Sequence, residues 1–189
     1  MKKIFSLIAV MLLMATAYDA SAQTLYGKWK ANMSTVENVV KSNSTLDSFD
    51  GSATIEFFED ATAEVTAYVS TSLPFDESVT CHMVFSVETR GTWTMEGNTL
   101  TMSSTALHYK IEKVMIEPSN PEFESLLPFI VQNVENQINA TAVDALAMQP
   151  KSVATIEFVS DNEIIYRDIT SGRAINTEDI AIHYYRVEE

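Results

Sequence analysis

The sequence predicts a mainly β domain, in which an antiparallel meander of about 8–10 strands closes into a barrel with one inserted helical segment. Three observations support this fold class. Apolar and polar residues alternate over most of the chain, turn signals separate the alternating runs, and residues 121–148 instead carry apolar side chains at helical spacing. Closure into a barrel is expected because it removes the exposed edges of a meander.

The N-terminal residues 1–22 have the composition of a secretory signal peptide. Lys2 and Lys3 precede an apolar run over residues 4–17, and Ala20-Ser21-Ala22 is an A-x-A cleavage site. This run is too short for a membrane span. We therefore expect cleavage, a single barrel domain at 23–189, and a periplasmic or secreted product without an integral membrane segment. The alternative is that residues 1–22 are retained as an N-terminal anchor.

The composition argues against several kinds of partner and chemistry. The net charge of −14 argues against binding to nucleic acid, because phosphate contacts need clustered Lys and Arg. Cys81 is the only cysteine, so neither an intramolecular disulfide nor a thiolate zinc site is expected. The three histidines match no local metal motif, and no nucleophile elbow occurs. We expect no catalytic residues, no metal and no cofactor, hence no enzymatic activity.

The first half of the chain is expected to contain a strand, a short helix and a hairpin. Residues 25–31 alternate as a strand, and residues 34–41 carry a helical pattern. A loop rich in Ser, Asn and Asp follows, up to Ser52. The hairpin then has arms at 53–58 and 62–71, and it is followed by a loop around Pro74.

The longest alternation in the chain runs from Val79 to Met95, with apolar residues at most odd positions. Gly91 interrupts it, and glycine is a residue at which a strand can bend sharply. The run is therefore either one long strand bent at Gly91 or two strands with an even break.

Gly97-Asn98 follows this run and predicts a two-residue hairpin turn of type II′. This turn places Met95 opposite Leu100 and Trp93 opposite Met102 on one apolar face. The other face then carries Thr94 opposite Thr101 and Thr92 opposite Ser103. A one-residue slip would scramble both faces, so the turn and the apolar pattern agree.

The second half of the chain continues the strand pattern on both sides of the helical segment. Leu107, Tyr109 and Ile111 alternate, and a parity shift to Val114 and Ile116 predicts a β-bulge. Three final strands are expected around 154–158, 164–166 and 180–186.

The inserted helix is expected to begin at Asn120-Pro121, with Asn as N-cap and Pro in the first helical position. Pro128 should kink it, and Gln149-Pro150 should end it. Such a helix packs outside the sheet, plugs or closes the barrel end, or forms a lid over a cavity.

Two motifs carry a family resemblance. Gly27-Lys28-Trp29 resembles the start of the lipocalin family, and the stretch from Gly91 to Leu100 resembles the G-T-W-x-x-x-G-N-x-L hairpin of lipocalin-like secreted proteins of Gram-negative bacteria. The resemblance implies a barrel with a central cavity that binds small lipophilic molecules. It also implies that Trp29 packs at the closed end of the barrel beneath Arg186. The chain departs from lipocalins because its long helix lies between later strands.

An apolar and aromatic set occupies alternating strand positions that can share the barrel interior: Phe57, Met83, Phe85, Trp93, Leu107, Tyr109, Phe158, Tyr166 and Tyr184. These residues either form the core alone or also line a cavity, where Tyr hydroxyls would orient a ligand. The leading hypothesis is an exported, non-enzymatic binding protein for a small hydrophobic or amphipathic ligand. The alternative is a packed barrel without a small-molecule ligand, serving as a protein-interaction or cell-envelope-associated module.

Overall fold

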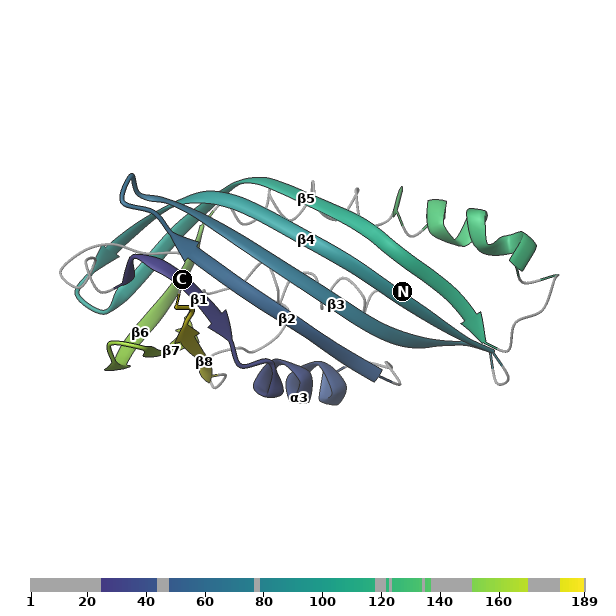
Figure 1. Ribbon diagram of the computed structural model, residues 1–189, viewed down its shortest axis with the longest axis horizontal. Coiled ribbons are helices and arrows are strands. Elements are labelled where there is room, and N and C mark those ends of the chain that lie inside the picture. The colour runs from purple at the N-terminus through teal and green to yellow at the C-terminus, as the bar shows by residue number, and fades with distance from the viewer. Residues whose placement is uncertain are drawn as a thin grey trace.

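The protein is seen in a computed structural model that describes residues 25–43, 48–76, 79–117, 122, 124–133, 135–136, 151–169 and 181–188. Over these residues, eight antiparallel strands follow one another around a closed ring, and the last strand pairs with the first (Figure 1). The predicted meander barrel is confirmed. The predicted signal peptide at 1–22 lies outside the described residues.

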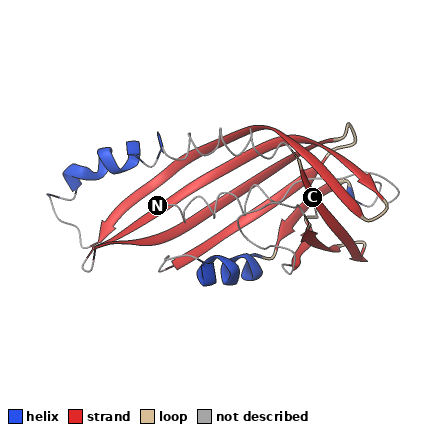
Figure 2. Ribbon diagram, turned by 180° about the vertical axis from the view of Figure 1, so that it is seen from behind, coloured by secondary structure: helices blue, strands red, loops and turns tan. Residues whose placement is uncertain are grey.

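The strands differ greatly in length. Their bounds are β1 Gly27–Ala31, β2 Ser48–Phe57, β3 Thr62–Asp76, β4 Val79–Glu96, β5 Thr99–Glu117, β6 Ser152–Ser160, β7 Glu163–Asp168 and β8 Ala181–Arg186. Three of them, β3 to β5, have 15 to 19 residues, whereas β7 and β8 have six each. The ring is therefore closed only near one end of the molecule. The sheet formed by β2 to β5 continues well beyond β6, β7 and β8 (Figures 1 and 2).

The strand β4 is one continuous element of 18 residues, so the single-strand alternative for this run is correct. Gly91 lies at a close approach of two backbones, where a Cβ atom would collide with the Ser103 carbonyl oxygen. The partner strand β5 carries an extra residue at this point, because Arg90 pairs with Ala106 and Gly91 pairs with Ser104. A glycine is therefore needed opposite this β-bulge.

A second bulge in β5 lies at Glu112, since Val84 pairs with Lys113 and Phe85 pairs with Ile111. It confirms the bulge predicted from the parity shift before Val114. Each bulge returns the apolar side chains of β5 to the inner face of the sheet. The two bulges also explain why a single strand here reads in the sequence as two.

The β4–β5 hairpin has the predicted register. Met95 pairs with Leu100 and Trp93 pairs with Met102, and both pairs are buried. Of the two turn residues, only Gly97 has a positive φ, of +58°, as a type II′ turn requires. The local turn chemistry and the burial of one face therefore select the same pairing.

The β2–β3 sheet extends further than predicted. Residues 48–52 were expected in a loop but belong to β2, and β3 continues through Pro74 to Asp76. The two additions pair with their neighbours, for example Ser48 with Ser72 and Pro74 with Thr80. Their composition is typical of loops, but pairing with the adjacent long strand outweighs local propensity.

Two helical segments accompany the sheet. The helix α3, Met33–Asn43, confirms the predicted short helix; Asn32 Oδ1 accepts a hydrogen bond from Ser34 N at 3.1 Å, and Val36 is buried. Of the helix predicted at 121–148, residues 124–133 are helical, as are 122, 135 and 136. The rest of that segment lies outside the described residues. Across the described ranges, no helix is long and apolar enough to cross a membrane.

The β2–β3 turn contains the one non-glycine residue with positive φ among the described residues, Ala61 at φ +63°. The turn is held by a hydrogen bond from Ala61 N to Phe58 O at 3.2 Å. Asp60 Oδ1 also accepts hydrogen bonds from the amide and the hydroxyl of Thr62. The left-handed conformation is therefore imposed on an alanine by its surroundings.

We expect Ala61→Gly to raise the free energy of unfolding by about 0.5–1 kcal/mol, because glycine has no Cβ penalty at positive φ. The matched variant is Gly97→Ala, which should lower it by a similar amount; no atom lies within 4 Å of the added Cβ, so only strain acts. Urea denaturation of both variants measures this. Changes of the same sign in the two variants would contradict the assignment.

Candidate functional site

The inner face of the sheet is almost entirely apolar. Along β4, every odd-numbered residue from Val79 to Met95 is buried, and the even-numbered residues between them are half-buried or exposed. Buried residues from all eight strands and from α3 form one apolar cluster. The interior is therefore the largest candidate surface for a lipophilic ligand.

The residues predicted to line the interior do gather there, with one exception. Five are buried members of the core cluster: Phe57, Phe85, Trp93, Tyr166 and Tyr184. Three pack against it and are half-buried: Leu107, Tyr109 and Phe158. Met83 is buried but lies outside this cluster, further along β4.

Trp93 lies at the centre of an aromatic group. Its ring contacts Phe57 edge-on at a centroid distance of 5.0 Å and Tyr26 at 5.6 Å. Its indole Nε1 donates to Phe58 O at 3.3 Å. Tyr26 is a member that sequence reasoning missed, because alternation assigned it to the polar face of the first strand. Gly27, with φ +103°, follows Tyr26 at the point where the strand begins, so the alternation does not extend to it.

The closed end of the ring is formed by Trp29 and Arg186, which pair across β1 and β8. Arg186 Cζ lies 4.2 Å from the centroid of the fully buried Trp29 ring. Arg186 Nε donates to Asp161 O at 2.9 Å, and its Nη1 donates to Tyr26 O at 2.6 Å. One guanidinium group therefore joins the start of β1, the β6–β7 turn and the Trp29 ring.

Tyr184 presents a buried polar atom to the apolar interior. The residue is 1% exposed, and its Oη has no hydrogen-bond partner among the described residues. Burial raises the pKa of this phenol, so the hydroxyl stays protonated and able to donate. An unsatisfied buried hydroxyl is uncommon in folded proteins and is typically completed by a water or a ligand.

Tyr109 connects the inner face of β5 to the inserted helix. Its hydroxyl donates to the main-chain oxygen of Glu135 at 3.0 Å. Burial, and then the charge of Glu135, raise the pKa of this phenol. The helical residues lie beside β5 in both views (Figures 1 and 2). The helix is therefore attached to a predicted ligand-binding residue, although Leu126 and Phe129 on it are exposed.

The outer face carries a polar row that sequence reasoning missed. Ser48 Oγ donates to Ser72 Oγ at 2.7 Å, Ser72 Oγ lies 2.7 Å from His82 Nδ1, and His82 Nε2 lies 3.1 Å from Glu117 Oε2. With the proton on Nε2, all three bonds run in one direction. Ser, His and Glu form nucleophilic triads in hydrolases. Here, however, Ser72 is only 7% exposed, and it lies on β3 with Ser48 of β2 on one side and His82 of β4 on the other, so a substrate could not reach its hydroxyl. We interpret the row as a cross-strand tie.

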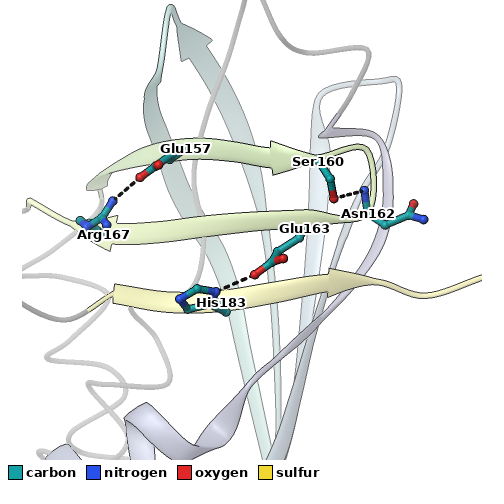
Figure 3. A network of polar contacts seen from close by, with 6 residues as sticks. All are labelled: Glu157, Ser160, Asn162, Glu163, Arg167 and His183. Atoms are coloured by element: carbon teal, nitrogen blue, oxygen red, sulfur yellow. Dashed lines mark hydrogen bonds and ion pairs between the residues drawn. The ribbon is translucent and has the colours of Figure 1, made fainter.

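A second polar group lies on the outer face of β6, β7 and β8 (Figure 3). His183 Nδ1 contacts Glu163 Oε1 at 2.7 Å, and Arg167 pairs with Glu157 at 2.9 Å. These pairs lie between neighbouring strands and point away from the apolar interior. In the part of the chain that the structure describes, no three His, Cys, Asp or Glu side chains are grouped to hold a metal ion.

Comparison with known proteins gives one family. The family model described as "Lipocalin-like domain" matches residues 25–120, just over half of the 189 residues. This range includes both Gly27-Lys28-Trp29 and the hairpin from Gly91 to Leu100, and the resemblance to lipocalin-like proteins is thereby confirmed. A search of curated proteins finds no match.

We expect Arg186→Met to lower the free energy of unfolding by about 2–3 kcal/mol, because it removes a cation–π contact and two hydrogen bonds to carbonyl oxygens. Arg186→Lys should lose less but not be neutral, since an ammonium cannot reproduce the guanidinium fork.

Arg167→Met is the matched control on the outer face. It removes an exposed ion pair and should lower the free energy of unfolding by less than about 1 kcal/mol. Denaturation curves, followed by Trp fluorescence, compare the three variants. Equal losses for Arg167→Met and Arg186→Met would show that Arg186 has no special part in closing the ring.

Proposed function

Because this chain belongs to the lipocalin-like domain family, we propose that it is a non-enzymatic binding protein for a small hydrophobic or amphipathic molecule. The observation that carries the proposal is the extent of the apolar inner face. It continues along β4 and β5 far beyond the point where β6 leaves β5, since those two strands pair only from Thr99 to Met102. A sheet that only had to fill a small ring would not need this extension.

The ligand lies against the inner face of β5, where the apolar side chains are less completely buried than those of β4. Leu107, Tyr109 and Ile111 are half-buried, whereas Val87 and Phe85 of β4, which pair with Tyr109 and Ile111, are buried. A ligand that covers this half-buried apolar surface gains about 25 cal/mol of favourable free energy for each Å² that it removes from water. The Tyr109 hydroxyl lies beside this surface; because it donates its hydrogen to Glu135 O, it could only accept a hydrogen bond from a ligand.

A second candidate function is a protein-interaction or envelope-associated module with a filled interior. The observation that favours it is the exposure of large apolar side chains on the helical residues, where Phe129 is 70% exposed and Leu126 is 43% exposed. Such side chains on a surface helix are typical of contacts with another protein. Under this alternative, the protein retains a protein partner in a pull-down and takes up no lipophilic probe.

We also propose that the protein is exported and acts in the periplasm or outside the cell. The support is the basic, apolar and A-x-A pattern of residues 1–22. After expression of the full sequence in a bacterial host, the product should begin at Gln23 and be recovered without detergent. Intact-mass spectrometry measures the N-terminus. A product that keeps residues 1–22 and stays with the membrane fraction would favour the retained anchor.

Binding is tested with the uncharged fluorescent probe N-phenyl-1-naphthylamine. The wild-type protein should bind it and enhance its fluorescence. Leu107→Lys should weaken binding at least about tenfold, because it introduces a charge on the proposed contact surface. The matched control is His108→Lys, the next residue on β5, whose exposed side chain points away from the interior.

The control should change the affinity by less than about twofold. Native mass spectrometry of the protein from its source cells then seeks the natural ligand. If the wild-type protein binds no probe and carries no bound molecule, the carrier function is wrong.

A further inference from the structure

We infer that the ligand is an uncharged lipophile whose polar group accepts a hydrogen bond from the Tyr184 hydroxyl. This inference rests on the binding function proposed above, and it adds the chemical class of the ligand. It separates alcohols, ketones, esters and similar neutral molecules from fatty acids and other lipophilic anions.

The first support is the state of the Tyr184 hydroxyl. It is enclosed by the apolar cluster, next to Tyr166, whose ring centroid lies 6.1 Å from that of Tyr184. Its oxygen has no partner among the described residues. A phenylalanine would fill the same space without an unsatisfied hydroxyl, so packing alone does not explain a tyrosine here. A ligand oxygen would complete its hydrogen bonding.

The second support is the charge of the inner face. Within the described strands, the cationic residue at an inner-face position is Arg186, which pairs with the buried Trp29. Arg186 lies at the closed end, where its guanidinium stacks on Trp29 and donates to two main-chain oxygens. It is therefore already occupied, and the fully buried Trp29 ring lies against it.

Asp168 lies at the opposite end of the ring. It ends β7, two residues beyond Tyr166 on the same face, and is 4% exposed. At this end, Asp168 pairs with Ala154 of β6, and β6 in turn pairs with the start of β5. A carboxylate ligand that approached from the extended part of the sheet would pass Asp168 and would meet no cationic side chain at an inner-face position of the described strands before Arg186. Burial of an anion without a cationic partner is strongly unfavourable.

The third support is that the half-buried surface of β5 packs against the same apolar cluster as Tyr184. The half-buried Leu107 and Tyr109 pack against the same cluster that contains Tyr184. Met102, a member of this cluster on the same strand as Leu107, has a flexible thioether side chain that can change rotamer to admit a ligand. The polar group of the ligand would then reach Tyr184 while its apolar body lies toward β5.

The experiment compares two ligands with the same chain, 1-dodecanol and dodecanoate, as competitors of N-phenyl-1-naphthylamine at pH 8 and below their aggregation limits. On the wild-type full-length product, dodecanol should compete at least about tenfold more strongly than dodecanoate. Tyr184→Phe should weaken the competition by dodecanol about fivefold to tenfold. Its melting temperature without ligand should not fall, because the lost hydroxyl makes no hydrogen bond in the free protein.

Tyr185→Phe is the matched control. It removes a hydroxyl from the neighbouring residue of β8, whose side chain is 44% exposed on the outer face. It should leave both competitors unchanged.

Three outcomes would overturn the inference, and each is distinct. If dodecanoate competes as well as dodecanol, the ligand class is wrong while the binding function stands. If dodecanol is preferred but Tyr184→Phe leaves its affinity unchanged, Tyr184 does not bind the polar group. If the wild-type protein binds no probe at all, the proposed function fails, and this inference fails with it.

Discussion

The closure of the ring is the constraint on which the rest of this structure depends. Three residue pairs join β1 to β8, and backbone hydrogen bonds from Asn32 N to His183 O and from Val187 N to Lys28 O extend this short ladder at its two ends. The Arg186 guanidinium strengthens it by holding the Trp29 ring and two main-chain oxygens at once. Because charge-assisted hydrogen bonds and cation–π contacts are stronger away from bulk water, one residue stabilises a junction that few strand residues can form.

Closure at one end allows asymmetry at the other. The short strands complete the ring near Trp29, and β2 to β5 are then free to extend as a curved sheet whose inner face stays apolar. Side-chain hydrogen bonds join these long strands outside the ring. The clearest example is the row Ser48, Ser72, His82 and Glu117, which connects β2, β3, β4 and β5. The same polypeptide thus combines a packed end, which supplies stability, with an extended apolar surface, which supplies area for binding.

Much of this organisation could be predicted from the sequence, because period-2 alternation and turn chemistry act locally. The Gly97-Asn98 turn and the burial of Trp93 specify the same register, so the hairpin was predicted residue by residue. Residues 48–52 were not, since Ser, Asp and Gly favour loops and only pairing with β3 makes them a strand. The contacts of His82 and of the Tyr184 hydroxyl depend on which strands become neighbours, and periodicity does not contain that information.

The two bulges of β5 have a consequence for the behaviour of the protein in concentrated solution. Beyond Met102, the edge of β5 that faces away from β4 has no strand paired with it among the described residues. An unpaired edge of this length is a template for pairing with another chain. The extra residues at Thr105 and Glu112 interrupt its regular hydrogen-bonding pattern, and Lys110 and Lys113 place charges along it. An incoming strand would therefore find neither a continuous ladder nor a flat surface, which protects the protein from edge-to-edge aggregation.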